Sequence, residues 1–245
     1  MLMASLADDV EWPIRTERLL LRPAVAADVG ATWQIRRIES VSQWLTRAPG
    51  ALDEHVKHFG EPESLAKTLV IELDGRIIGD LMIAVDDAWA QAEIAERAKA
   101  VQADLGWVLH PDHGGRGFAT EAVREVLRIC FDDLGLRRVS AECFAANEAS
   151  WRLMERVGMR RETHTLRESL HRSGEWLDGF GYALLAEEWA NRLLSQLNKA
   201  IQFPRSERLG LRMAVVLRTH VWSRACRPHE LRAATECWSR WPTIP

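Results

Sequence analysis

Three glycines and an arginine stand close together in the stretch HPDHGGRGFATEAV, residues 110–123. An apolar run typical of a strand precedes them, and an amphipathic run typical of a helix follows. The first turn of a helix presents unpaired N–H groups and about half a positive charge. Glycines let those groups approach an anion without interference from a Cβ atom, and Arg116 adds a guanidinium suited to phosphate. The stretch therefore predicts a phosphate cradle, with a plain strand-to-helix turn as the alternative.

Two other phosphate-binding loops fit this stretch poorly. The P-loop requires Gly-Lys-Ser/Thr, which does not follow the glycines. The run Gly115-x-Gly117-x-x-Thr120 lacks the third glycine of the dinucleotide fingerprint, and no clear acidic residue for a ribose ends the next strand. We therefore expect neither a nucleoside triphosphate nor NAD.

The first half of the chain must supply elements that position this loop. TERLLLRP (16–23) has the pattern of a strand, and 24–48 that of one or two helices. Residues 64–85 form two β-rich runs joined by Asp74-Gly75, which is typical of a hairpin because a type I′ turn needs positive φ. The Ala- and Glu-rich segment 86–102 predicts a helical insertion.

The second half alternates between strands and helices. A strand is predicted over 103–111, and a helix follows the loop, because apolar residues there recur at spacings of three and four. A strand over 137–145, a helix over 147–159 and a final strand running into a short helix over 180–189 complete the order. This alternation, with a hairpin in the first half, predicts an α/β fold with a mixed sheet.

Composition and charge limit the classes of function. The chain has 245 residues, of which 47% are hydrophobic, enough for one domain and an extension. Basic residues outnumber acidic ones by seven in 190–245 and are outnumbered by ten in 1–189, which sums to the net charge of −3. We therefore expect no nucleic-acid partner for the whole protein, although the basic extension permits a contact with RNA or the ribosome. The extension itself is expected to be disordered or to pair two chains in a homodimer.

The sequence also indicates where the protein resides. No apolar run is long enough to span a membrane, and the N-terminus lacks the pattern of a signal peptide. The cysteines show no CxxC spacing, which is typical of free thiols in a reducing compartment; they are Cys130, Cys143, Cys226 and Cys237. A cytoplasmic protein is expected.

Several segments, in order, resemble the GNAT N-acetyltransferases of the RimJ/RimL type. They are TERLLLRP, DGRIIGDL, GWVLHPDHGGRGFATEAV, NEASWRLMERVGMRRE and YALLAEEW, and together they cover roughly residues 14–189. The resemblance implies a three-layer α/β/α fold with a splayed, mixed central sheet. It also implies a domain over 13–189 that includes the insertion, a tail over 1–12 and a C-terminal extension over 190–245.

The resemblance implies acetyl-CoA as co-substrate, attacked directly by an amine. The oxyanion donor is then a backbone N–H at Val108 or Leu109. The residues expected to bind the cofactor also include Gly114, Gly115, Arg116, Gly117, Phe118, Ala119, Thr120, Asn147 and Arg152. Asp112 departs from the family pattern Gln/Arg-x-x-Gly-x-Gly/Ala, because it stands where Gln or Arg is usual. It should face away from the phosphates, or the affinity for CoA should be poor.

Three side chains are candidates for proton transfer. Ser150 is the candidate acid for the CoA thiolate, since the neighbouring position is Trp151 and not a tyrosine; alternatively Ser150 only supports the first turn of its helix. Asp104 and Glu168 are the candidate bases, with Glu168 favoured. Both could equally be solvated charges.

No metal is expected, because acetyl transfer needs none. The pair His55 and His58 has no third ligand nearby in sequence and is interpreted as part of a solvated helix face. The expected partners are acetyl-CoA and an amine acceptor, either a protein N-terminus or a small molecule, with no membrane. Trp33 and Trp44 lie in the segment that the resemblance assigns to the acceptor side. A non-catalytic module that binds CoA or another partner is the competing hypothesis.

Overall fold

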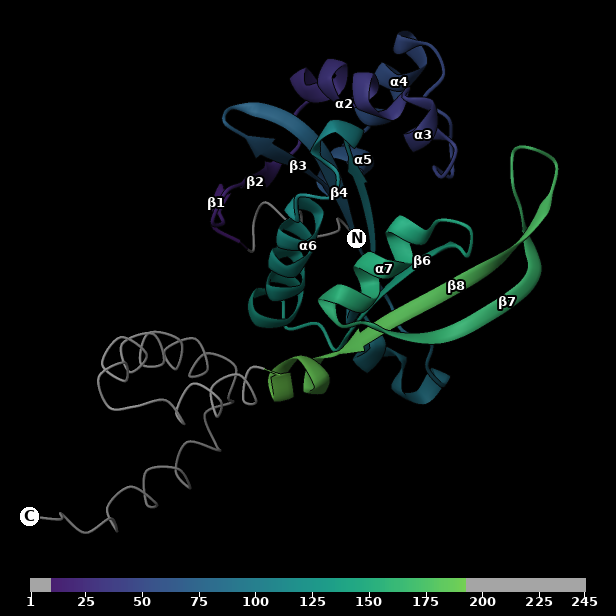
Figure 1. Ribbon diagram of the computed structural model, residues 1–245. Coiled ribbons are helices and arrows are strands. Elements are labelled where there is room, and N and C mark those ends of the chain that lie inside the picture. Colours follow the sequence, from purple (N-terminus) through teal and green to yellow (C-terminus); the bar gives the residue numbers. More distant parts are fainter. Residues whose placement is uncertain (1–9, 193–245) are drawn as a thin grey trace, which may run out of the picture. The chain divides into compact units, whose positions relative to one another are not determined.

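The computed structural model describes residues 10–192 (Figure 1). The chain divides into two units, one ending at Trp189 and one beginning at Ala190, where the sequence changes in character. The predicted tail 1–12 and extension 190–245 lie outside the described residues, except for 10–12 and 190–192.

A single eight-stranded sheet organises the first unit. Its strands are β1 (Ile14–Arg15), β2 (Leu20–Pro23), β3 (Thr68–Leu73), β4 (Arg76–Asp86), β5 (Gln102–Leu109), β6 (Arg138–Phe144), β7 (Arg160–Leu170) and β8 (Trp176–Leu185). Their order across the sheet is β1-β2-β3-β4-β5-β6-β8-β7. All neighbours are antiparallel except β5 and β6, which are parallel. The predicted mixed sheet is confirmed.

Most helices lie between strands in sequence, and residues 186–192 form a further helical stretch directly after β8, as predicted. The helices between strands are α2 (Val29–Arg36), α3 (Glu39–Ser42), α4 (Leu52–Phe59), α5 (Pro62–Ala66), α6 (Phe118–Arg128) and α7 (Glu148–Val157). Short 3-10 turns cover Ala26–Asp28, Ala92–Ala98 and Pro111–His113, and a π-helical turn, Ile129–Asp133, extends α6. Figure 1 shows α2, α3 and α4 gathered together, away from α6 and α7.

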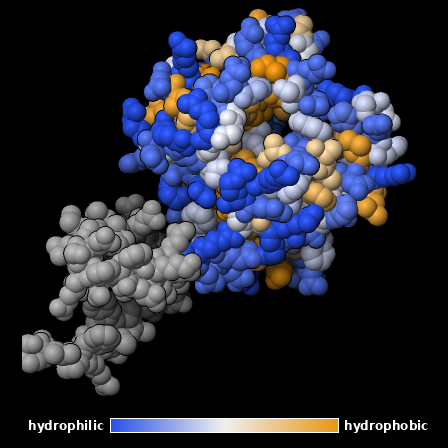
Figure 2. All heavy atoms as spheres, in the orientation of Figure 1, coloured by the Kyte–Doolittle hydropathy of each residue, from blue (hydrophilic) through white to orange (hydrophobic). Residues whose placement is uncertain are grey.

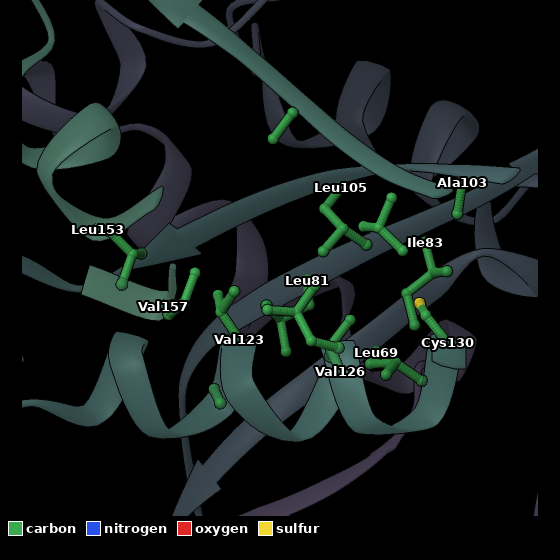
Figure 3. Packing of buried hydrophobic residues seen from close by; sticks show 14 of the residues in the cluster. Leu69, Leu81, Ile83, Ala103, Leu105, Val123, Val126, Cys130, Leu153 and Val157 are labelled. Carbon is green, nitrogen blue, oxygen red and sulfur yellow. The ribbon is translucent and has the colours of Figure 1, made fainter. Parts of the chain in front are cut away.

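The main core lies between the sheet and the helices α6 and α7. Val123 and Val126 of α6 are fully buried, as the spacing of three and four predicts. They pack with side chains of several strands and of α7 (Figure 3), among them Leu69, Leu81, Ile83, Ala103, Leu105, Leu153 and Val157. This packing fixes the start of α6, and therefore the loop before it, relative to the sheet.

The other face of the sheet is covered from the α2–α5 region. Val70 of β3 packs with Phe59 of α4, whereas its neighbour Leu69 belongs to the main core. Successive strand residues point to opposite faces, so the sheet has apolar layers on both sides. The expected three-layer arrangement is observed.

Two segments differ from the sequence-based expectation. The insertion over 86–102 is not an α-helix: β4 runs on to Asp86, a 3-10 helix covers Ala92–Ala98, and Gln102 already belongs to β5. Strand β7 was not predicted, because its charged side chains are mostly exposed and lack an apolar period. It pairs with β8 in a long hairpin that projects from the sheet (Figure 1).

Candidate functional site

The two parallel strands separate along their length. The last pair between β5 and β6 joins Asp104 to Ser140. β5 nevertheless continues to Leu109, and β6 continues to Phe144. The carboxyl halves of both strands therefore face each other across an opening in the sheet, with backbone groups that no strand partner satisfies.

Alternation along β5 decides which backbone groups face that opening. His110 donates its N–H to Ile78 at 2.8 Å, which makes this a hydrogen-bonded pair of the antiparallel β4–β5 ladder. Val108 pairs with Asp80 in the same register, so its N–H points toward β4. The N–H of Leu109 points the opposite way, toward the opening. Of the two predicted oxyanion donors, Leu109 is thus the one whose N–H is free of the ladder.

Gly79 of β4 allows β4 and β5 to approach each other closely beside Val108. A Cβ added to Gly79 would lie 2.2 Å from the carbonyl oxygen of Val108, which is a severe clash. Packing of β4 against β5 thus requires glycine at position 79, in the DGRIIGDL segment, and this requirement was not apparent from the sequence alone.

The loop after β5 forms a row of free amides. Gly117 caps α6 in the left-handed conformation, with φ of 82°, and Glu121 is the first residue to bond back to the Gly117 carbonyl. In the part of the chain that the structure describes, the N–H groups from Gly115 to Thr120 have no acceptor. Free N–H groups at a helix N-terminus bind anions, so the geometry agrees with the predicted cradle.

Two arginines flank the first residue of α6. The guanidinium carbons of Arg18 and Arg116 lie 4.4 and 4.9 Å from the centre of the Phe118 ring. Arg18 also forms an ion pair with Glu121 at 2.7 Å. Burial would raise the pKa of the Glu121 carboxyl, but hydrogen bonds from Thr16 and Arg18 outweigh it and lower the pKa below 4.5. Sequence reasoning missed Arg18, which reaches the loop from the β1–β2 turn 98 residues away.

The residues present fit the phosphates of a CoA-type ligand. Besides the free amides, Nδ1 of His113 is buried and has no hydrogen-bond partner among the described residues. Buried polar atoms are rarely left unsatisfied, so this loop retains unused capacity for polar groups. Asp112 lies in the 3-10 turn before the glycines with its side chain 85% exposed, where water solvates its charge.

Ser150 and Asn147 lie at the start of α7, beside the open half of β6. The Asn147 side chain accepts a hydrogen bond from the Ser150 N–H at 3.3 Å, so it serves as an N-cap. The Ser150 side chain lies beside the Cys143 thiol. Burial raises the pKa of Cys143 to about 11, although the interaction with Ser150 opposes this. Because Cys143 lies beyond the last β5–β6 pair, Ser150 is beside the opening.

The remaining predicted residues are not brought to this place. Asp104 lies at the closed end of the opening, bonded to Ser140 and about 16 Å along β5 from Leu109 at ~3.3 Å per residue. This position does not favour Asp104 as the base. Arg152 forms an ion pair with Glu148 on the exposed face of α7. Glu168 lies exposed in an irregular stretch of β7, separated from β6 by β8.

An ion pair between half-buried Arg36 and buried Asp80 joins α2 to the sheet near the end of β5. Arg36 donates to both carboxylate oxygens of Asp80, which is 1% exposed and pairs with Val108 in register. Burial would lower the pKa of Arg36, but the carboxylate holds it above its usual value. This pair was not predicted. It fixes α2 against β4 where the backbone of β5 approaches the loop.

The structure shows that the interpretation of His55 as a solvated side chain is wrong. It is 7% exposed and its Nε2 lies 3.1 Å from the Thr32 hydroxyl. Burial lowers the pKa of His55 below 6.5, and the nearby charge of Arg36 lowers it further. His58 is exposed, as predicted. In the described residues no group of His, Cys, Asp or Glu side chains could hold a metal ion.

Three rings from distant elements meet at the open end of β6. Trp44, Phe144 and His171 have ring centres 5.4–6.3 Å apart. Ser173 donates its N–H to Nδ1 of His171, so Nε2 carries the proton and donates to the Gln43 carbonyl at 3.0 Å. The turn of the β7–β8 hairpin is thereby attached to the segment after α3. Figure 2 shows a hollow in this face, in the region that Figure 1 draws between α3 and α7.

The fold is thus an α/β fold with a parallel strand pair that opens toward a row of free amides, an arrangement suited to an anionic ligand. Comparison with known proteins identifies the family. The profile of the acetyltransferase (GNAT) domain matches residues 18–160, more than half of the chain. The chain therefore belongs to the GNAT acetyltransferase family.

Individual relatives agree with this assignment. The N-acetyltransferase YnaD of Bacillus subtilis is 37% identical over 86 residues, 35% of this chain and 50% of YnaD. The FsC-acetyl coenzyme A-N(2)-transacetylase of Aspergillus fumigatus is 28% identical over 122 residues, 47% of this chain and 52% of that protein. The chain thus spans about half the length of these curated relatives.

Solved structures resemble a larger share of the chain. A GNAT-family acetyltransferase from Bacillus anthracis has a TM-score of 0.61 at 26% identity, over 72% of this chain and all of that one. RimJ of Mycobacterium smegmatis, in complex with CoA-disulfide, has a TM-score of 0.59 at 26% identity, over 73% of this chain and 88% of that one. Among residues 10–192, no helix is long and apolar enough to cross a membrane.

Proposed function

We propose that this protein transfers an acetyl group from acetyl-CoA to a primary amine, either a protein N-terminus or a small-molecule amine. The observation that carries the proposal is the opening between β5 and β6, with free amides from Gly115 to Thr120 at its end. Membership of the GNAT family supports it. The likeness to RimJ with CoA-disulfide supports CoA as the ligand and supports the RimJ/RimL type.

The proposed reaction is a direct attack within a ternary complex. The amine nitrogen attacks the thioester carbonyl of acetyl-CoA, so that the C–N bond forms and the C–S bond breaks. The Leu109 N–H donates a hydrogen bond to the carbonyl oxygen as its negative charge develops. Ser150 gives a proton to the departing thiolate, directly or through water. The proton lost by the amine goes to solvent, because neither candidate base, Asp104 or Glu168, is brought to the opening.

Release of CoA thiol from acetyl-CoA, measured with a panel of N-terminal peptides and small amines, tests this proposal. We expect turnover with at least one amine class, and mass spectrometry should find one acetyl group on the acceptor amine. Tight binding of CoA with no turnover on any amine would contradict the enzymatic proposal. That result would favour the competing hypothesis, a GNAT-fold module that binds CoA without catalysis.

A further inference from the structure

Arginines near the cradle differ in whether an acid neutralises them. Arg18 is paired with Glu121, and Arg128 with Glu125 and Asp133. In the described part of the chain, Arg124 and Arg156 form no ion pair with any acid. The two acids of α6 that flank Arg124 in sequence, Glu121 and Glu125, are thus already bound by other arginines.

Arg124 and Arg156 lie together, one helical turn from the cradle. Arg156, near the end of α7, donates from Nη1 to the Thr120 hydroxyl at 3.2 Å. Arg124 of α6 donates from Nη2 to the Arg156 carbonyl at 3.4 Å. The residues next to them in sequence, Val123 of α6 and Val157 of α7, belong to the same buried core (Figure 3).

Their distance from the cradle suits a second phosphate group. Arg124 follows Thr120 by four residues, a rise of about 6 Å along the helix. Its side chain is directed back toward the N-terminus of α6, as side chains on helices are. CoA carries a pyrophosphate and a separate 3′-phosphate on the same nucleotide. A ligand whose pyrophosphate is held by the amides up to Thr120 would bring its 3′-phosphate to this surface.

We propose that Arg124 and Arg156 form a site for the 3′-phosphate of CoA, which makes the protein select CoA over 3′-dephospho-CoA. This inference rests on the proposed function, since it requires that CoA is the ligand. Two guanidiniums without acidic partners provide charge-assisted donors for a phosphate dianion. The free amides of the cradle bind the part of the ligand that both compounds share.

Calorimetric titration with CoA and with 3′-dephospho-CoA tests the proposal, at one ionic strength for the full-length chain. The variants are Arg124→Gln and Arg156→Gln. Arg97→Gln is the control for net charge, because Arg97 is exposed in the insertion before β5, at the end of that strand opposite the cradle. Thermal melting checks that each variant is folded. If one arginine variant does not fold, the other is sufficient for the test.

We expect the wild type and Arg97→Gln to bind CoA about tenfold more tightly than 3′-dephospho-CoA, the effect of one charge-assisted contact. Each arginine variant should lose that preference by weakening CoA binding alone. Equal affinities in the wild type, or equal weakening of both ligands in the variants, would overturn the inference while leaving the proposed function intact. If the wild type binds neither compound, the proposed function itself fails.

Discussion

At the scale of single residues, the cradle depends on the conformation of Gly117. A left-handed φ costs an L-residue about 1–2 kcal/mol. A Cβ at this position would also lie 3.4 Å from Nη2 of Arg18. The first turn of α6 therefore keeps its amides directed at one point only while residue 117 lacks a side chain.

Replacing Gly117 by alanine should weaken CoA binding by about fivefold or more, because about 1 kcal/mol of strain is relieved by moving the loop. Gly135→Ala is a matched control, since Gly135 also has positive φ, of 65°, and open space around it, but it follows the far end of α6. Both variants should lose similar thermal stability. Equal CoA affinity for the two variants in calorimetry would refute the role of Gly117 in the cradle.

Replacing Ser150 should lower kcat without weakening the binding of acetyl-CoA. Ser150→Ala removes the proposed donor to the thiolate, so kcat should fall by about 10²-fold, the usual size of an acid–base contribution. KM for acetyl-CoA should stay nearly unchanged. Cys143→Ala removes the thiol beside Ser150 and should leave kcat within about twofold. An unchanged kcat for Ser150→Ala in steady-state kinetics would assign the serine to helix support alone.

At the scale of elements, the packing of α2 and α4 on the sheet depends on polar groups that the sequence did not reveal. Thr32 and His55 are buried together, and the Arg36–Asp80 pair lies close enough to affect the pKa of His55. Buried charges and polar groups of this kind are stable only when paired. They hold α2 and α4, which lie on either side of the Trp44 segment in sequence, against the sheet.

His55 gives this packing a measurable pH dependence. Its folded pKa lies below its usual 6.5 because burial disfavours the charged ring. The unfolded chain therefore binds the proton more readily, and the stability from His55 is complete above pH 6.5 and declines as the pH falls toward the folded pKa. Urea unfolding should show this decline for the wild type and for His58→Gln, but less of it for His55→Asn. Identical pH profiles for all three proteins would contradict the burial of a neutral His55.

The regular elements were predictable because their patterns are local. The apolar period of α6 and the Asp74-Gly75 turn are written in consecutive residues. Arg18, Arg156 and the ring cluster of Trp44 and His171 were not predictable, since they meet the site only through tertiary contacts across many residues. The fold and the glycine loop followed from the sequence, whereas the acid and base assignments did not, because Ser and Glu occupy helix starts and exposed strands for other reasons too.

At the scale of the whole molecule, charge separates the two parts of the chain. The segment 1–189, which has a net negative charge, contains the whole region that matches the family, 18–160. The basic extension lies outside the described residues apart from 190–192. A role of the extension in RNA binding, in pairing two chains, or as a disordered tail stays a prediction, and so does the cytoplasmic location.

Truncation after Arg192 should therefore leave CoA binding intact. The cut keeps Trp189, whose ring stacks on Phe131 at 5.7 Å between centres and donates to Asp132. We expect CoA affinity within about twofold of the full chain and a similar melting temperature, since the cradle and the core lie before residue 190. A loss of CoA affinity in a folded truncated protein would assign part of the ligand site to the extension.

The central claim is that CoA lies in the opening between β5 and β6 with its pyrophosphate on the loop. Hydrogen–deuterium exchange, measured on the full chain with and without saturating CoA, tests this most directly. The account predicts slower exchange in peptides that cover Leu109, whose N–H faces the opening. It predicts the same for peptides that cover Gly115–Thr120, whose N–H groups have no acceptor among the described residues. The insertion around Ala92–Ala98 should be unaffected. Bound CoA that leaves the loop unprotected, or that protects another surface instead, would contradict the account.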